Sequence, residues 1–269
     1  MKSKALSTFL LTLFATFATP VLAAKPEPWG LGFQPSASPM AEKIDSFHDM
    51  LLWIIIAIAI FVLVLLVWVI IRYNHKANPE PKQFTHNVMI EVIWTLVPIL
   101  ILVVIAIPSF RVLYYNDKSH DPEMTLKIVG YQWYWNYEYP DYGDIAFDSY
   151  MIADEDITEG QERLLSTDTQ VVLPIDTDIQ ILTSAGDVIH SWAIPAFGVK
   201  LDAIPGRWNE TWVNINKPGT YYGQCSELCG KDHAYMPIEI KAVSKEEFKT
   251  WALANGAKPA DFETATIEE

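Results

Sequence analysis

The two cysteines of this chain lie four residues apart, at Cys225 and Cys229. His233 and Met236 follow within the next seven residues, and another histidine, His190, lies upstream. In an exported protein, a pair of cysteines commonly forms a disulfide. The neighbouring side chains indicate another chemistry, because thiolate, imidazole and thioether groups are the ligands of cupredoxin-type copper sites.

The number of candidate ligands bears on how many metal ions could bind. One thiolate, two imidazoles and one thioether complete a single copper site and leave Cys225 without a role. Two bridging thiolates would instead give each of two copper ions one terminal histidine. Met236 and the backbone carbonyl of Glu227 would then be weak ligands, one for each ion. We therefore favour a dinuclear copper centre, which is suited to passing single electrons.

Two alternatives remain open at this point. A structural zinc could be bound by two cysteines and two histidines, His190, Cys225, Cys229 and His233, but this site gives Met236 no role. A simple disulfide between the two cysteines is the other alternative.

An acidic and aromatic stretch precedes most of these ligands. Residues 128–162 contain no Lys or Arg but nine acidic residues: Glu138, Asp141, Asp144, Asp148, Asp154, Glu155, Asp156, Glu159 and Glu162. Such a stretch could simply be a solvated face, or it could steer a basic partner in a salt-dependent way. Alternation along a single strand over residues 131–137 would place Tyr131, Trp133, Trp135 and Tyr137 on one face. Most such rings are buried, whereas an exposed one would be a docking platform where electrons enter.

Short segments rich in β-branched and aromatic residues predict the domain that positions these side chains. They are Thr125–Gly130, Val171–Ile175, Ile179–Ser184, Val188–Ile194, Glu210–Asn216 and Tyr235–Ala242. Gly, Pro and Asp separate them, which predicts an antiparallel sandwich or barrel. Ser244 and Glu247 have the spacing of a capping box and predict a short helix that ends near Gly256.

Two apolar stretches without charged residues, 50–71 and 92–110, are each close to the length that crosses a bilayer. The loop between them carries Arg72, Lys76 and Lys82 against Glu80, so the positive-inside rule places it in the cytoplasm. Residues 1–23 have the features of a secretory signal, and residues 25–43 are expected to be irregular. Glu91, just before the second stretch, is either a carboxylate at the headgroup boundary or a proton-handling group.

The charge distribution excludes two classes of protein. The chain has 269 residues and a formal net charge of −14, and residues 112–269 carry a net charge of −16. A nucleic-acid-binding protein needs a basic surface, so this class is excluded. The two apolar stretches exclude a purely soluble protein.

Taken together, these motifs resemble subunit II of the bacterial haem-copper cytochrome c oxidases. The resemblance covers nearly all of the mature chain. Its motifs are residues 84–87, 91–98, 132–135, 147–150, 187–192, 202–207 and 225–236. It implies a two-helix transmembrane hairpin followed by an all-β, cupredoxin-like Greek-key barrel that holds a copper A centre.

The residue patterns and the resemblance together give an expected division of the chain. The expected segments are a signal peptide at 1–23, a periplasmic segment at 24–49, spans at 50–71 and 88–110, a cytoplasmic loop at 72–87, the copper domain at 111–243, and a C-terminal helix and tail at 244–269. The protein would lie in the bacterial inner membrane with its C-terminal domain in the periplasm.

Roles for individual residues follow from the same resemblance. His190, Cys225, Cys229, His233 and Met236 match the side-chain copper ligands, and Glu227 matches the carbonyl ligand, whose side chain would reach a magnesium ion at subunit I. Trp133 matches the tryptophan where electrons enter from cytochrome c. Glu138, Asp144, Asp148 and Asp187 match the acidic docking surface. Glu91 matches a carboxylate at a proton-uptake path, and Asp202 and Arg207 are expected to face subunit I.

The implied function is to accept electrons from cytochrome c at copper A and pass them to haem a of subunit I, together with other oxidase subunits. Oxygen reduction and most proton pumping would occur in subunit I, which would hold the haems. Two alternatives are a metal-free structural subunit of a quinol oxidase and a membrane-tethered copper carrier.

Overall fold

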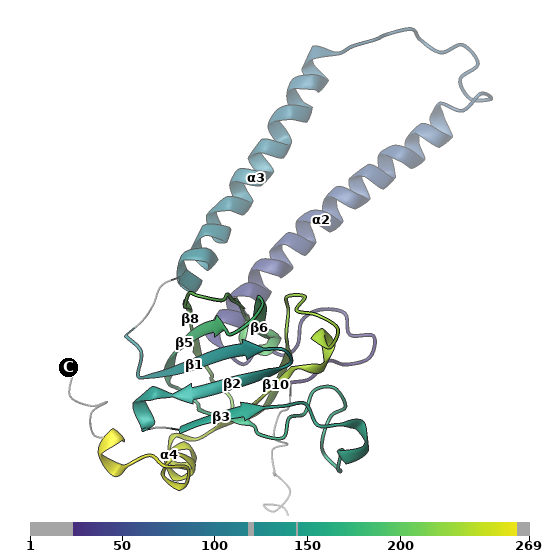
Figure 1. Ribbon diagram of the computed structural model, residues 1–269. Coiled ribbons are helices and arrows are strands. Elements are labelled where there is room, and N and C mark those ends of the chain that lie inside the picture. Colours follow the sequence, from purple (N-terminus) through teal and green to yellow (C-terminus); the bar gives the residue numbers. More distant parts are fainter. Residues whose placement is uncertain (1–23, 118–120, 144, 263–269) are drawn as a thin grey trace, which may run out of the picture.

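The computed structural model describes residues 24–117, 121–143 and 145–262. The expected signal peptide, the last part of the tail and Asp144 therefore lie outside the described residues. Figure 1 shows a β-domain from which two long helices extend, joined by a loop at their far ends. The predicted two-helix hairpin and all-β, cupredoxin-like domain are confirmed.

The two long helices are α2, Pro39–Arg72, and α3, Val88–Asp117. Both are long and apolar enough to cross a membrane, and most of their side chains are exposed in the isolated chain. Each helix continues beyond its apolar stretch towards the β-domain. The expectation of an irregular segment at 25–43 is therefore wrong for its last residues, because Ser38 caps the helix and Pro39 is suited to its first position.

The β-domain is built from two larger sheets and a small one. The strands are β1 Met124–Tyr131, β2 Tyr134–Tyr139, β3 Ile145–Ser149, β4 Val171–Pro174, β5 Asp178–Ala185, β6 His190–Ile194, β7 Val199–Ala203, β8 Asn209–Asn214, β9 Gly219–Gln224 and β10 Pro237–Val243. Their order is β3-β2-β1-β5-β8 in one sheet, β4-β10-β9 in the second and β6-β7 in the third. The β1–β5 and β4–β10 pairs are parallel, so the expected purely antiparallel arrangement is wrong at these two places.

Alternate residues of the strands form the core of the β-domain. In β1 the buried residues include Leu126 and Ile128, and in β2 they are Trp135, Tyr137 and Tyr139. The side chains between them are only partly buried. This period of two is what a sheet with one covered face requires.

The aromatic stretch is a hairpin rather than one strand. The chain turns at Gln132 and Trp133, and Tyr131 pairs with Tyr134 at the end of the ladder. The expected common face for the four rings is therefore wrong. The two-residue turn separates Trp133, which is half-buried at the end of the hairpin, from the buried rings of β2.

The predicted C-terminal helix is confirmed as α4, Lys245–Ala254. The Ser244 hydroxyl accepts a hydrogen bond from the Glu247 backbone N–H at 3.2 Å, and the Glu247 carboxylate accepts one from the Ser244 N–H at 3.1 Å. Phe248 and Ala252 are buried against the β-domain, so this capping box starts a helix that covers part of the core.

The first turn of α2 is embedded in the β-domain. Ser38 is fully buried, and its hydroxyl donates to the Phe197 carbonyl at 2.7 Å while accepting from the Ala41 N–H at 3.0 Å. Gly198, with a φ of 68°, lies against this turn, and a Cβ there would be 3.0 Å from the Ala41 backbone. The membrane helix is thus fixed to the domain by hydrogen bonds and close backbone packing.

We predict that Ser38→Ala lowers the free energy of unfolding of the β-domain by about 1–2 kcal/mol, because it removes a helix cap and leaves a buried carbonyl without its donor. Urea unfolding of the full chain in detergent, followed by tryptophan fluorescence, measures this change. Ser46→Ala is the matched control, since the Ser46 hydroxyl is exposed and donates only within α2. Equal stability of the two variants would contradict the embedded cap.

Candidate metal centre

The two cysteines lie in the loop that joins β9 to β10. The strands pair antiparallel up to Gln224 and Pro237, so residues 225–236 form a loop closed at its base. Both thiols are buried and free, and their sulfur atoms lie 3.9 Å apart. A disulfide needs a separation of about 2.05 Å. The disulfide alternative therefore does not describe this arrangement.

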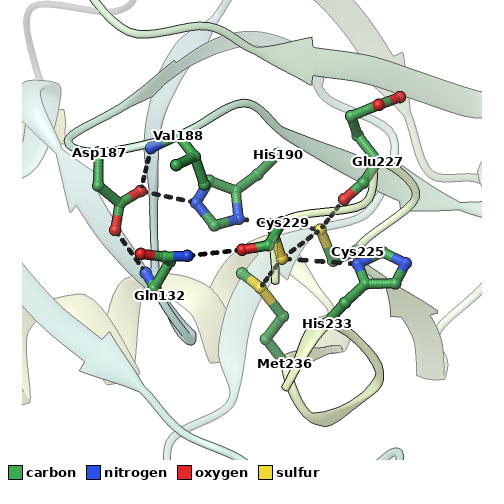
Figure 2. Close-up of polar contacts among 9 residues, drawn as sticks. All are labelled: Gln132, Asp187, Val188, His190, Cys225, Glu227, Cys229, His233 and Met236. Carbon is green, nitrogen blue, oxygen red and sulfur yellow. Dashed lines mark hydrogen bonds and ion pairs between the residues drawn. The ribbon is translucent and has the colours of Figure 1, made fainter. Parts of the chain in front are cut away.

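Each sulfur faces its own imidazole, as Figure 2 shows. His190 Nδ1 lies 3.9 Å from Cys225 Sγ, and His233 Nδ1 lies 3.5 Å from Cys229 Sγ. His190 is fully buried at the start of β6, whereas His233 lies in the short 3₁₀ turn His233–Tyr235 of the cysteine loop. One candidate ligand thus comes from a distant strand and three come from the loop.

The two weak donors are also divided between the sulfurs. The Glu227 carbonyl oxygen lies 3.3 Å from Cys225 Sγ, and Met236 Sδ lies 3.5 Å from Cys229 Sγ. Among the described residues, the ligand atoms of His190, Cys225 and Cys229 all lie within 4.8 Å of one another, and His233 is not in this group. This division favours two similar half-sites, each made of a sulfur, an imidazole and a weak donor, over a single tetrahedral metal site.

The ionisation of the two thiols differs. Burial opposes ionisation of Cys225, but hydrogen bonds with His190 and with the backbone of Ser191 bring its pKa down to about 7. Burial and the neighbouring charge of Cys225 raise the pKa of the Cys229 thiol. The site therefore gives up one proton readily, and a bound cation would have to displace the second. A soft donor set of this kind fits copper.

Asp187 fixes the orientation of His190 from the turn before β6. Its Oδ1 lies 2.8 Å from His190 Nε2 and accepts the Val188 N–H at 2.6 Å, while Oδ2 accepts the Gln132 N–H at 2.7 Å. Burial opposes ionisation of Asp187, but these hydrogen bonds lower its pKa. A carboxylate on Nε2 leaves Nδ1 of the ring free to face the sulfur.

Gln132 connects the aromatic hairpin to the cysteine loop. Its Nε2 donates to the Cys229 carbonyl at 2.7 Å, and its backbone N–H is held by Asp187. The ring of the next residue, Trp133, packs against Gly230, where an added Cβ would come within 2.9 Å of the indole. The hairpin turn is thus bonded to the cysteine loop and to the residue that orients His190.

Close packing completes the pocket of His190. A Cβ on Gly130 would lie 2.9 Å from the imidazole, so the ring rests directly on the β1 backbone. The Trp135 ring meets the imidazole edge-on with centroids 5.9 Å apart, and its Nε1 donates to the Met236 carbonyl at 3.3 Å. Glycine is therefore required at position 130 for the ring to occupy this place.

The comparisons with known proteins identify the family. Residues 124–243 match the family described as cytochrome c oxidase subunit II, periplasmic domain, and residues 26–112 match its transmembrane domain. The chain belongs to the cytochrome c oxidase subunit II family. The predicted inner-membrane topology, with a periplasmic β-domain, is thereby confirmed, and the family implies a copper A site.

Relatives of this subunit II match over most of their length. A probable cytochrome c oxidase subunit 2 from Rickettsia bellii is 51% identical over 257 residues, which covers 96% of this chain and 94% of the relative. The cytochrome c oxidase subunit 2 of Oenothera berteroana is 47% identical and covers 87% and 93%. The crystal structure of the periplasmic domain of subunit II from Bradyrhizobium japonicum is 50% identical, covers 51% of this chain and 96% of that one, and has a TM-score of 0.48.

The other predicted residues of this subunit II lie at separate places. Glu138 in β2 is half-buried and Asp148 in β3 is exposed. Asp202 and Arg207 are exposed and line an open cavity of about 490 Å³ beside Trp208. Glu91 lies in the first turn of α3, at the end of that helix farthest from β1, and accepts a hydrogen bond from the Asn87 N–H at 3.3 Å.

Sequence reasoning missed two residues of the centre. Gln132 reaches Cys229 across 97 residues, and the sequence contains no signal for such a contact. Asp187 was predicted only as a docking carboxylate. Its position three residues before a candidate ligand histidine, next to the start of a strand, is the signal that could have indicated a partner for the imidazole.

We predict that Asp187→Asn lowers the affinity of the full chain for copper about 10- to 100-fold, because the amide cannot accept all three hydrogen bonds. Competition with a copper chelator measures the affinity of the full chain. Asp156→Asn removes the same charge from the exposed turn Asp154–Asp156 and should leave copper affinity unchanged. Equal effects of the two substitutions would mean that Asp187 acts only through its charge.

Proposed function

We propose that this chain holds a dinuclear copper A centre, receives single electrons from cytochrome c and passes them to haem a of subunit I. One observation carries this proposal. Two buried, unbonded sulfurs lie 3.9 Å apart, and each has an imidazole and a weak donor of its own. The ligands would be His190, Cys225, Glu227 through its carbonyl, Cys229, His233 and Met236.

Copper in such a centre would supply one-electron redox chemistry. The chain's contribution is a donor set that is already arranged. The loop is closed at its base by the Cys225–Met236 backbone hydrogen bond of 3.4 Å, and His190 is held by Asp187 and Gly130. Fixed ligands change little between oxidation states, so little free energy is needed for reorganisation.

Electrons are expected to enter from cytochrome c at the end of the aromatic hairpin. Trp133 lies against Gly230, next to a sulfur ligand, and is half-buried, so its ring can meet a partner at the surface. Glu138, Asp144 and Asp148 would attract a basic cytochrome c. Asp187, the fourth predicted docking residue, is 30% exposed at its side chain, so it can add to this field while it orients His190.

Electrons are expected to leave towards subunit I from the opposite side of the cysteine loop. The Glu227 carbonyl faces Cys225, while its side chain points away from the sulfurs in Figure 2 and is exposed. This direction supports the proposal that the carboxylate reaches a magnesium ion at subunit I. Asp202 and Arg207, both exposed, are proposed to face the same subunit.

The division of the chain and the role of Glu91 complete the proposal. The signal peptide at 1–23, the spans at 50–71 and 88–110, the cytoplasmic loop at 72–87 and the copper domain at 111–243 would place Glu91 at the cytoplasmic side of the bilayer. A carboxylate at that depth is suited to collecting protons for subunit I. Haems and oxygen chemistry would belong to subunit I.

A metal-free quinol-oxidase subunit is not favoured, because all six donor groups are present and converge. A copper carrier would share the donor set but would release its copper to a competing ligand. Two copper ions per chain, held without exchange, therefore separate the proposed function from the carrier and from a single zinc.

We predict that Cys229→Ser removes the near-infrared and mixed-valence copper signals and reduces oxidation of cytochrome c at least 100-fold, because one of the two thiolates that would hold the copper is lost. Electron spin resonance, a copper count and turnover of the purified oxidase measure these effects. Met236→Leu, which removes only a weak donor, should keep two copper ions and shift the signal. Normal turnover in Cys229→Ser would refute the copper assignment.

We predict that Glu138→Gln with Asp148→Asn weakens the dependence of cytochrome c oxidation on ionic strength, because two charges of the steering field are removed. The apparent KM measured between low and high salt gives this dependence. Glu155→Gln with Asp156→Asn removes two charges from the turn Asp154–Asp156, outside the predicted docking set, and is the control. Identical salt dependence in both double variants would dismiss a localised docking surface.

A further inference from the structure

A cavity of about 540 Å³ lies at the junction where both membrane helices reach the β-domain. From α2 it is lined by Lys43, Phe47 and Met50, and from α3 by Pro108 and Arg111, among others. Its wall is therefore apolar on the side of the membrane stretches and carries its charged groups on the side of the domain.

The two cations of this cavity lie on facing surfaces. Lys43 Nζ lies 4.4 Å from the centre of the Tyr115 ring, and Tyr115 follows Arg111 by one helical turn on the same side of α3. Across the described ranges, neither Lys43 nor Arg111 forms an ion pair. Glu42 also lines the cavity, and its carboxylate accepts a hydrogen bond from Asn216 at 3.3 Å. Two like charges with one carboxylate leave the lining with an excess positive charge, which an anion would neutralise.

The depth of the cavity matches the headgroup layer. Arg111 directly follows the uncharged stretch 92–110, and Met50 is the first residue of the uncharged stretch 50–71. The cavity thus spans the boundary between the hydrocarbon and the outer aqueous side, where lipid phosphates lie. Lys and Arg side chains at this boundary extend their charged ends into the headgroup layer.

A second, apolar cavity lies one helical turn deeper between the same helices. It has a volume of about 280 Å³ and is lined by Ile54, Val97, Leu100, Ile101 and Val104. Ile54 follows Met50 by one turn of α2, and Val104 precedes Pro108 by one turn of α3. The two cavities therefore follow one another along the seam between α2 and α3, polar at the outside and apolar inside.

We propose that this seam binds one phospholipid of the outer leaflet. Its phosphodiester lies between the Lys43 ammonium and the Arg111 guanidinium, and one acyl chain occupies the cavity at Ile54 and Val104. Phosphate oxygens accept charge-assisted hydrogen bonds from both cations, and guanidinium is suited to two oxygens at once. A cationic cavity followed by an apolar cavity matches the phosphate headgroup and the acyl chain of a lipid molecule.

The first experiment counts lipids on the purified oxidase that contains this chain. After exhaustive washing in detergent, native mass spectrometry should find one phospholipid retained with the wild-type subunit. Lys43→Gln with Arg111→Gln should reduce its occupancy about tenfold or more, because charge-assisted contacts to the phosphate are lost. Arg72→Gln with Lys76→Gln removes two charges at the other end of α2 and should keep the lipid. Equal occupancy in wild type and Lys43/Arg111 variant, or equal loss in both variants, overturns the proposal.

A second experiment needs no charge substitution. The unmodified oxidase is placed in phosphatidylcholine nanodiscs that contain phosphatidylglycerol with a photoactivatable group in its acyl chain. Labelled peptides should include residues 97–104, and Val104→Trp, which fills the apolar cavity without changing charge, should remove that label. If another subunit or no lipid occupies the seam, these peptides remain unlabelled while other membrane-facing peptides are labelled, and the proposal is wrong.

Discussion

The separation of the two thiol sulfurs is the constraint on which the rest of this structure depends. In the periplasm, an unprotected pair of cysteines four residues apart would readily be oxidised. Here the sulfurs are buried 3.9 Å apart, and an imidazole nitrogen lies within 3.9 Å of each one. This arrangement requires the register of β9 and β10, which closes the loop, and the position of β6, which supplies His190. The β-domain is in this sense a frame that keeps two reactive groups apart and ready for metal.

The same frame is joined firmly to the membrane helices. Ser38 and the backbone around Gly198 hold the first turn of α2 inside the domain. The other helix, α3, contacts the domain through the Tyr115 ring, which meets the Trp212 ring edge-on with centroids 5.4 Å apart. Because both helices contact the β-domain, the position of the cysteine loop relative to the membrane helices depends on these contacts.

Features formed by residues close together in the sequence could be predicted, whereas contacts between distant segments could not. Four of the five proposed side-chain ligands lie within twelve residues, and their chemical types restrict the possible metals, so a candidate centre could be predicted without a fold. The membrane stretches and the α4 capping box depend on neighbouring residues in the same way, and they were also predicted.

The hairpin turn at Gln132 and Trp133 was not predicted. The aromatic stretch contains no Gly, Pro, Asn or Asp at these two positions to indicate a turn. The parallel β1–β5 pair joins segments about 55 residues apart, and local patterns do not encode such pairs.

Gln132 explains why that unpredicted turn matters for function. Its backbone is held by Asp187 and its side chain by the Cys229 carbonyl, so one residue joins the partner of His190 to the cysteine loop. Trp133, the next residue, is carried by the same turn and rests on Gly230. A displacement of the turn would therefore disturb the orientation of an imidazole, the path of the loop and the surface ring together. These contacts therefore hold the surface ring, the cysteine loop and the carboxylate that orients His190 in one arrangement.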